Sequence, residues 1–361
     1  MSASERVLGW DILRGLCALS VMVYHLMYWQ DLATVSTLGT YGVYLFFILS
    51  GASLAYVYDA QAIGSLRGFA AFLAVRWLRL APLYIVVCAL FLMMLAARNG
   101  QWLTDGMERL AFNATFLFGA FTPAVTALAI GGWSLGIEFM FYLAMPLLVR
   151  VLPHAWLRMG LLLVLVALQW TWIDRTVGAL GLAEATQLYH QVPAFAAYFF
   201  AGCLIGHARR QHTYALPLRA GAVTWVLIAA LLVALAPSVS GGELIGWRGI
   251  VLPVVCVAVV WVSGHVRVGP RARPAAQWLG DITYGTYLLH PMLFFGFAWF
   301  VLPALTTTSA EALSAPVRLA ILVAGVALSC GLAAASERAF ERPVRAAGRR
   351  LLGRWLTPRS T

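Results

Sequence analysis

Long apolar runs, separated by short polar segments, make up most of the chain. Each run is about 17 to 23 residues long, enough for an α-helix to cross the ~30 Å hydrocarbon core of a bilayer. The pattern predicts an all-α integral membrane bundle of about ten transmembrane helices. A shorter apolar segment at 108–121 is expected to be interfacial or re-entrant. The candidate spans are 9–29, 41–58, 80–97, 133–152, 156–174, 191–207, 219–236, 247–263, 281–303 and 316–335.

Arginine is distributed unevenly between the segments that join these spans. With the N-terminus placed in the cytoplasm, 19 arginines lie inside, five lie outside, and Arg14 lies within the first span. Because cytoplasmic segments of membrane proteins are enriched in basic residues, this asymmetry predicts that both termini are cytoplasmic. We expect a transmembrane domain over 1–340 and a basic cytoplasmic tail over 341–361 that binds membrane lipids through their headgroups.

The composition supports the membrane class and excludes others. Only 11% of the 361 residues are charged and 62% are hydrophobic, whereas about a quarter of a soluble protein is charged. The net charge of +11 comes from arginines in short loops, so nucleic acid is not expected as a partner. The five cysteines lie apart in apolar segments, so neither a metal site nor a disulfide is indicated, and no permanently bound cofactor is expected.

The first span carries ionisable residues in an otherwise apolar sequence. Arg14 and His25 are 11 residues apart, close to three helical turns, so they share one face about 16 Å apart along the axis. Asp11 lies one turn from Arg14. An Asp–Arg pair at the interface, and a histidine bonded to another helix, are the structural alternatives. Since intramembrane ionisable groups usually face a cavity or pathway, we interpret the aligned residues as lining one.

The fourth span begins with WSLGIEFMFYLAMP and contains Glu138. This span runs from outside to inside, so Glu138 is expected at the depth of His25. A carboxylate beside an imidazole fixes its tautomer and stabilises the imidazolium, the arrangement of a general base and its orienting group. We predict that His25 and Glu138 are catalytic; a Glu138 bonded to a neighbouring helix is the alternative. Trp133, Ser134 and Tyr142 are candidate pocket residues.

Two further spans carry polar residues at helical spacing. Arg76 and Arg79 in RWLRLAP lie one turn apart before the third span, which suits phosphate binding, although membrane anchoring is the simpler alternative. In LGDITYGTYLLHP of the ninth span, Tyr284, Tyr287 and His290 recur every three residues along one side of the helix. They either line a cavity or hold helices together.

Taken in order, these segments resemble the acyltransferase-3 family, bacterial membrane acyltransferases that modify sugars and other small acceptors. The resemblance covers almost the whole chain. It is carried by DILRGLCALSVMVYH, GVYLFFILSG, RWLRLAP, WSLGIEFMFYLAMP, YFFAGCLIG, LGDITYGTYLLHP and FERPVR.

The resemblance implies that an acyl group, usually acetyl, moves from cytoplasmic acyl-CoA to a hydroxyl of an extracytoplasmic glycan or lipid-linked sugar, in the bacterial inner membrane. It further implies that Arg14 and His25 matter for activity and that Arg76 and Arg79 bind the donor. Tyr44 stands where the family often has an acidic residue, so that role would fall elsewhere. Direct transfer to the acceptor is expected.

A mechanism follows as a hypothesis. The donor phosphates would bind to Arg14, Arg76 and Arg79, and the pantetheine arm would present the thioester near His25 as general base. Tyr142 or Tyr287 would donate to the oxyanion, and a covalent acyl-histidine intermediate stays open. Two other functions are considered: an acyltransferase for a small molecule such as a macrolide, and a proton-coupled secondary transporter. The chain shows no inverted repeat of the kind that many transporters have.

Overall fold

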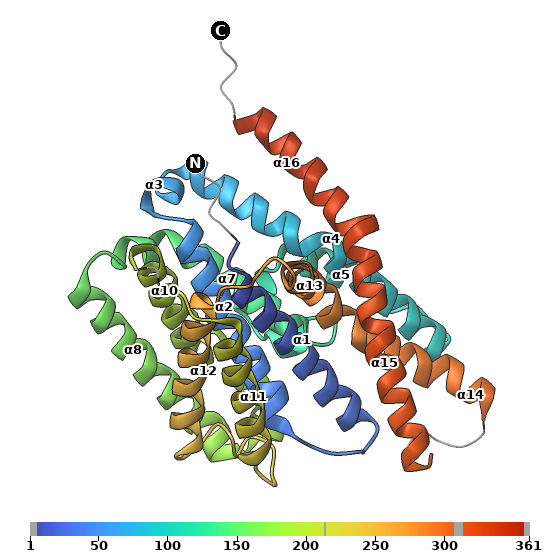
Figure 1. The fold of residues 1–361 in the computed structure, drawn as a ribbon. Coiled ribbons are helices and arrows are strands. Elements are labelled where there is room, and N and C mark those ends of the chain that lie inside the picture. Colours follow the sequence, from blue (N-terminus) through green and yellow to red (C-terminus); the bar gives the residue numbers. More distant parts are fainter. Residues whose placement is uncertain (1–5, 213, 307–312, 357–361) are drawn as a thin grey trace.

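The chain folds into a bundle of helices (Figure 1). The computed structural model describes residues 6–212, 214–306 and 313–356. Within them there is no strand, only an isolated bridge between Leu216 and Val266. The elements are α1 (Leu8–Trp29), α2 (Ser36–Val57), α3 (Ala60–Ile63), α4 (Leu66–Asn99), α5 (Gly106–Thr115), η1 (Leu117–Ala120), α6 (Pro123–Thr126), α7 (Gly132–Val151), α8 (Ala155–Ile173), η2 (Asp174–Gly178), α9 (Leu182–Tyr189), η3 (Val192–Ala194), α10 (Ala196–Gln211), α11 (Leu218–Ala234), α12 (Arg248–His265), α13 (Arg273–Gly296), η4 (Phe297–Val301), α14 (Leu302–Leu305), α15 (Ala315–Ser336), η6 (Glu337–Glu341) and α16 (Arg342–Leu356).

The predicted all-α class is confirmed, and the described residues contain eight helices long and apolar enough to cross a membrane. The chain is therefore a multi-pass membrane protein. The predicted spans 191–207 and 219–236 correspond to the shorter helices α10, of 16 residues, and α11, of 17 residues. A total of about ten crossings stays a prediction.

Helix α4 begins earlier than the apolar pattern indicated. The span was predicted from residue 80, but the helix starts at Leu66, where the Ser65 side chain accepts a hydrogen bond from the Gly68 N–H and caps it. Arg76 and Arg79 therefore lie inside a helix of 34 residues and not at its start. Arginine is a good helix former, so the helix continues where the hydropathy falls.

Helix α2 is the most deeply buried span and holds the bundle together. Figure 1 shows α8, α10, α11 and α12 on one side of α1 and α2, with α4, α13 and α15 on the other. Glycines bring α2 and α10 into backbone contact: a Cβ on Gly51 would lie 2.0 Å from the Phe199 carbonyl oxygen, and one on Gly202 would lie 2.0 Å from that of Ile48. Small residues thus allow these two helices to approach closely.

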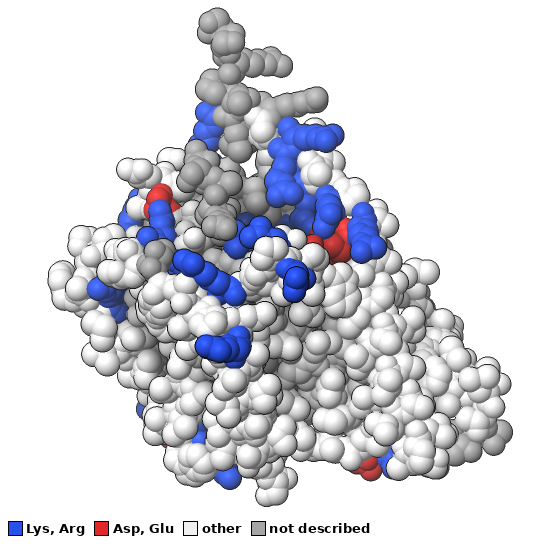
Figure 2. Space-filling view, viewed as in Figure 1, with Lys and Arg blue, Asp and Glu red and all other residues white. Residues whose placement is uncertain are grey.

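Arginine side chains gather at one end of the bundle, beside α3 and α16 (Figure 2). The start of α1 and the helix α16 both lie toward this end (Figure 1). The arginine asymmetry agrees with the predicted orientation, while cytoplasmic termini stay a prediction. Of the predicted tail, residues 357–361 lie outside the described residues. The boundary at residue 340 falls within the π-helical turn η6, which joins α15 to α16 without a break.

The short apolar segment at 108–121 forms α5 and η1, packed beside α4 and α7. Phe116 and Phe118 are completely buried. A Cβ on Gly119 would lie 2.1 Å from the Gly136 carbonyl oxygen, so this glycine allows η1 to press directly against α7. The segment therefore supports the helix that carries Glu138.

Candidate functional site

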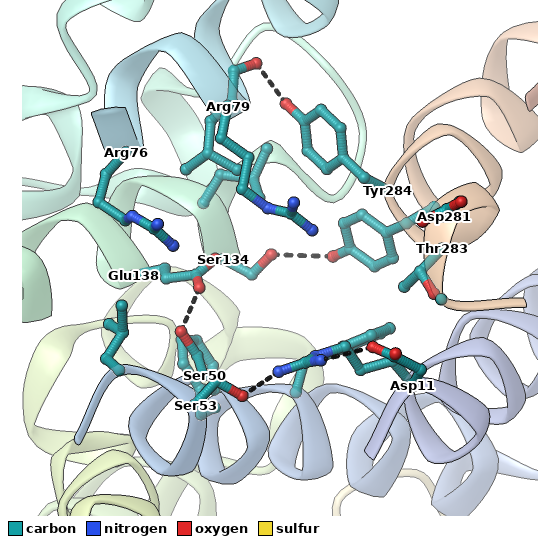
Figure 3. A pocket seen from close by; sticks show the side chains of 18 of the residues that line it. Asp11, Ser50, Ser53, Arg76, Arg79, Ser134, Glu138, Asp281, Thr283 and Tyr284 are labelled. Carbon is teal, nitrogen blue, oxygen red and sulfur yellow. Dashed lines mark hydrogen bonds and ion pairs between the residues drawn. The ribbon is translucent and has the colours of Figure 1, made fainter. Parts of the chain in front are cut away.

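A polar cavity of about 350 Å³, which we call the arginine chamber, opens between α1, α2, α4, α7, α13 and the turn from α15 to α16. This volume is within the usual range of small-molecule sites. Its charged lining residues are Arg6, Asp11, Arg14, Arg76, Arg79, Glu138, Asp281, Glu337, Glu341 and Arg345. Figure 3 shows Arg76 and Arg79 on one side of this chamber, pointing toward Glu138 and Ser134.

Arg14 is partly compensated within the chamber. Its guanidinium donates to the Asp11 carboxylate at 3.2 Å, to the Leu49 carbonyl oxygen at 3.3 Å and to the Ser53 hydroxyl. The Asp11 carboxylate also pairs with Arg6. The Asp–Arg pair considered from the sequence is thus present, and both of its members line the cavity. Asp11 and Arg14 therefore form a structural ion pair and also face a cavity, so both of the interpretations considered from the sequence apply to them.

Arg76 and Arg79 of α4 have no carboxylate partner among the residues that the structure describes. Arg76 donates to the Tyr58 hydroxyl at 3.3 Å, and its buried Nε has no hydrogen-bond partner. The Arg79 guanidinium makes no hydrogen bond or ion pair with any other residue that the structure describes. The buried Nε of Arg76 is left without a partner, which is costly, and Arg79 presents an exposed guanidinium to the cavity, so this side of the chamber suits an anion.

Glu138 binds other partners than the predicted one. Its carboxylate accepts from the Ser50 hydroxyl at 2.5 Å and from the Tyr142 hydroxyl at 2.7 Å. The Ser50 contact is visible in Figure 3. The expected pair of Glu138 and His25 does not form, since they line different cavities. Their depths were inferred from position along each helix, but Glu138 is bonded to Ser50, one turn from the Ser53 that binds Arg14, so it lies near Arg14 and not near His25.

A second cavity of about 410 Å³, which we call the aromatic chamber, contains His25. None of its described lining residues is Arg, Asp or Glu. The Trp133 and His190 rings lie 4.1 Å apart, centroid to centroid, and the Tyr44 and Tyr189 hydroxyls are hydrogen-bonded. Aromatic rings with hydroxyl and imidazole groups suit a neutral polar ligand. The ring-bearing and hydroxyl-bearing lining residues are Tyr24, His25, Thr40, Tyr44, Trp133, Thr186, Tyr189, His190 and Tyr287.

His290 takes the orienting place that was predicted for Glu138. Its Nδ1 lies 3.0 Å from the Thr286 carbonyl oxygen, which can only accept, so Nδ1 carries the proton. In the neutral ring, Nε2 is then an acceptor, and it lies 2.9 Å from Nδ1 of His25. His25 therefore donates through Nδ1 and keeps a lone pair on Nε2, the atom that a general base uses.

The two chambers meet at Val43 and Tyr287, which line both. The Tyr287 hydroxyl donates to the Gly131 carbonyl oxygen at 3.0 Å and lies 2.9 Å from the Ser134 hydroxyl. Gly131 has a φ of +79°, in the left-handed region that glycine adopts without strain. Arg14 and His25 thus line adjoining cavities that share Val43 and Tyr287.

The predicted pocket residues divide between the chambers. Asp11, Ser134, Tyr142 and Tyr284 line the arginine chamber, and Tyr44 and Trp133 line the aromatic chamber. The Tyr284 hydroxyl is also a packing group, because it donates to the Leu80 carbonyl oxygen. The helix-packing alternative therefore holds for Tyr284, whereas Tyr287 and His290 take part in the site.

Several site residues were missed from the sequence. Ser50 and Ser53 lie one turn apart on α2 and bind Glu138 and Arg14, but serines within an apolar run gave no distinct signal. Glu243 is completely buried and accepts from Ser36 and Thr40, which fixes the loop before α12 to the first turns of α2. Glu243 lies between two predicted spans, where a charged residue is ordinary, so no signal in the sequence identified it. His190 of the aromatic chamber, together with Asp281, Glu337, Glu341 and Arg345 of the arginine chamber, also lacked an assigned role.

Comparison with known proteins gives one match. A family model described as an acyltransferase domain, that of the acyltransferase-3 family, matches residues 7–334. Neither the curated proteins nor the solved structures gave a significant match. The described residues hold no group of three or more His, Cys, Asp or Glu side chains suited to a metal ion. Since the match covers most of the chain, including almost all of the candidate spans, the chain belongs to the acyltransferase-3 family and is a membrane acyltransferase.

Proposed function

We propose that this acyltransferase transfers an acyl group, acetyl in the simplest case, from acyl-CoA to a hydroxyl of a glycan or lipid-linked sugar. The observation that carries the proposal is the junction of two unlike cavities. One is rich in arginine and contains Arg79, and the other contains His25 and, among the described residues that line it, no Arg, Asp or Glu. A polyanionic donor and a neutral acceptor would each find a matching cavity.

The arginine chamber is proposed to bind the phosphates of coenzyme A. Arg79 and the Nε atom of Arg76 have unused hydrogen-bond donors, and guanidinium groups match phosphate geometry. Arg14 completes the set from α1. The clustering of arginines at this end of the bundle, seen in Figure 2, supports a cytoplasmic orientation of the chamber in the bacterial inner membrane.

The thioester is proposed to reach His25 at the boundary formed by Val43 and Tyr287. Arg14 and His25 are 11 residues apart on α1, a rise of about 16 Å, which a pantetheine arm can cover. The Tyr287 hydroxyl lies at this boundary and is the better placed candidate for the oxyanion donor, which requires its proton to turn from the Gly131 carbonyl oxygen to the thioester oxygen. Tyr142 lines only the arginine chamber, away from this boundary, so its alternative assignment is less well supported.

The chemical step uses the free lone pair of His25. Nε2 accepts the proton of the acceptor hydroxyl while the oxygen attacks the thioester carbonyl. Collapse of the tetrahedral intermediate breaks the C–S bond, and the thiolate takes the proton back from the imidazolium. His290 orients His25 through Nδ1 throughout. The acceptor is proposed to bind against Trp133 and His190, because sugar rings stack on aromatic side chains.

The test uses membranes that contain the chain and acetyl-CoA labelled in the acetyl group. We expect label to enter an alkali-labile ester in the glycan or glycolipid fraction, and His25→Ala to abolish this without lowering protein level. Exposed His154, the residue immediately before α8, provides the matched control, His154→Ala. Equal labelling with the wild type and the His25→Ala variant would show that His25 is not the general base. Labelling of a small soluble product instead would reassign the acceptor.

A further inference from the structure

The segment that follows the family match also contributes to the arginine chamber. The match ends at residue 334, yet Glu337, Glu341 and Arg345 line this cavity. Their side chains are only 6%, 4% and 17% exposed. The two glutamates lie on the π-helical turn η6, and π-turns within helices occur frequently at functional sites.

A glycine brings α16 close to the arginines of α4. A Cβ on Gly348 would lie 2.5 Å from Cδ1 of Leu78, which lies between Arg76 and Arg79 in the sequence. Arg345 and Gly348 are three residues apart and so lie on one face of α16. The same face that packs on α4 therefore carries Arg345 into the chamber.

Ion pairs hold Arg345 in place. Its guanidinium pairs with Glu337 at 2.5 Å and with Glu341 at 3.4 Å. Arg342, on the outer side, links Glu337 to Asp281 of α13 at 3.6 and 3.2 Å. Because a guanidinium has five N–H donors, two carboxylate contacts leave donors free for a further anion.

We propose that Arg345 is an anion-binding residue of the donor site. With Arg76 and Arg79 it binds the phosphate groups of a nucleotide-bearing acyl donor, so that α16 forms part of the binding site. This inference rests on the proposed function for the identity of the donor, but the anion site itself can be tested separately. Glu337 and Glu341 are positioning residues that hold the guanidinium at the cavity wall.

The experiment measures dissociation constants of coenzyme A and of inorganic pyrophosphate for the purified full chain, by calorimetry. Arg345→Ala is expected to weaken both about tenfold, the usual effect of losing one charge-assisted hydrogen bond. Arg345→Lys keeps the positive charge but loses the planar set of guanidinium N–H donors. Its dissociation constants should therefore lie between those of the wild type and those of Arg345→Ala. Arg349→Ala is the matched control, because exposed Arg349 lies one turn further along α16, and its effect should stay under about twofold.

Each outcome decides the inference. Equal binding by Arg345→Ala and Arg349→Ala would overturn it. If the wild type binds pyrophosphate but not coenzyme A, the proposed donor is wrong. The role of Arg345 is then decided by the dissociation constants of pyrophosphate for the wild type and the variants. Binding of neither ligand would overturn both proposals. Should Arg345→Ala fail to fold, Arg345→Lys takes its place: it keeps the charge but loses the guanidinium geometry, so pyrophosphate binding should weaken, and binding equal to that of the wild type would refute the assignment.

Discussion

The two chambers lie side by side in one helical bundle but differ in the side chains that line them. The arginine chamber has five arginines and five carboxylates among its described lining residues, and within this part of the chain Arg76 and Arg79 have no carboxylate partner. The aromatic chamber has rings, hydroxyls and two histidines, and no Arg, Asp or Glu among its described lining residues. The contrast is what the proposed function requires, with donor binding in one chamber, transfer chemistry in the other, and Val43 and Tyr287 lining both.

The largest effect is expected in the aromatic chamber. His25→Ala should lower kcat for acyl transfer by about 10²- to 10⁴-fold, the usual contribution of a general base. The dissociation constant of coenzyme A should not change, because the phosphates bind in the other chamber. Radiolabel transfer and calorimetry on the same preparation measure both quantities. A large loss of coenzyme A binding in this variant would show that donor binding and transfer chemistry are not separated between the two chambers.

The orienting role of His290 can be distinguished from a packing role. His290→Leu removes the acceptor of the His25 Nδ1–H and should lower kcat about 10- to 100-fold, because a lost buried partner costs about 1–3 kcal/mol. His290→Gln offers an oxygen acceptor and should recover part of the rate at unchanged KM for the donor. Equal rates for the two variants at equal thermal stability would indicate that His290 only fills space.

Removal of the unpaired arginine tests the other chamber. Arg79→Ala should raise the KM for acyl-CoA about tenfold and change kcat much less, because the interaction is with the donor phosphates. Steady-state kinetics in membranes measure this split, and Arg349→Ala corrects for the loss of one positive charge. An unchanged KM would assign Arg79 to membrane topology, the simpler alternative considered from the sequence.

The boundary between the chambers should influence which acyl group passes. Val43→Ala is expected to increase the use of butyryl-CoA relative to acetyl-CoA, by up to about tenfold, because a methyl-sized change in an apolar passage discriminates weakly. Competition between the two donors gives the ratio directly. Val21→Ala is the matched control, since Val21 lines only the aromatic chamber. The same shift in both variants would mean that the boundary does not select the acyl group.

The smallest effect is expected outside both chambers. The Arg210 guanidinium and the Ala62 N–H hold the pKa of Asp59 below its usual value. The Asp59–Arg210 pair is largely exposed, so Asp59→Asn should cost less than about 1 kcal/mol and leave transfer unchanged. Because the folded-state pKa is lowered, this stabilisation is present near neutral pH and is lost as the pH falls through that value. Thermal melts at pH 7 and pH 4 measure it, and a larger loss at pH 7 would contradict the estimate of a weak surface pair.

The sequence predicted the membrane class, the helical segments and much of the candidate site. Apolar length identifies a spanning helix, and the helical period places Arg14 and His25 on one face of α1, as the two cavities bear out. The start of α4 could not be predicted from hydropathy, because hydropathy falls at Arg76 and Arg79 while the helix continues. Helical periodicity describes one helix at a time, so it could not identify which residue of another helix each polar group contacts.

Local spacing along the chain determined which residues of this protein share a helix face, and the arginine count gave its expected orientation. Only the tertiary structure decided that His25 meets His290 and not Glu138, and that the cavity divides at Val43 and Tyr287. The physical reason is that the rotation of one helix against another depends on packing, as at Gly51 and Gly119, between segments far apart in the sequence.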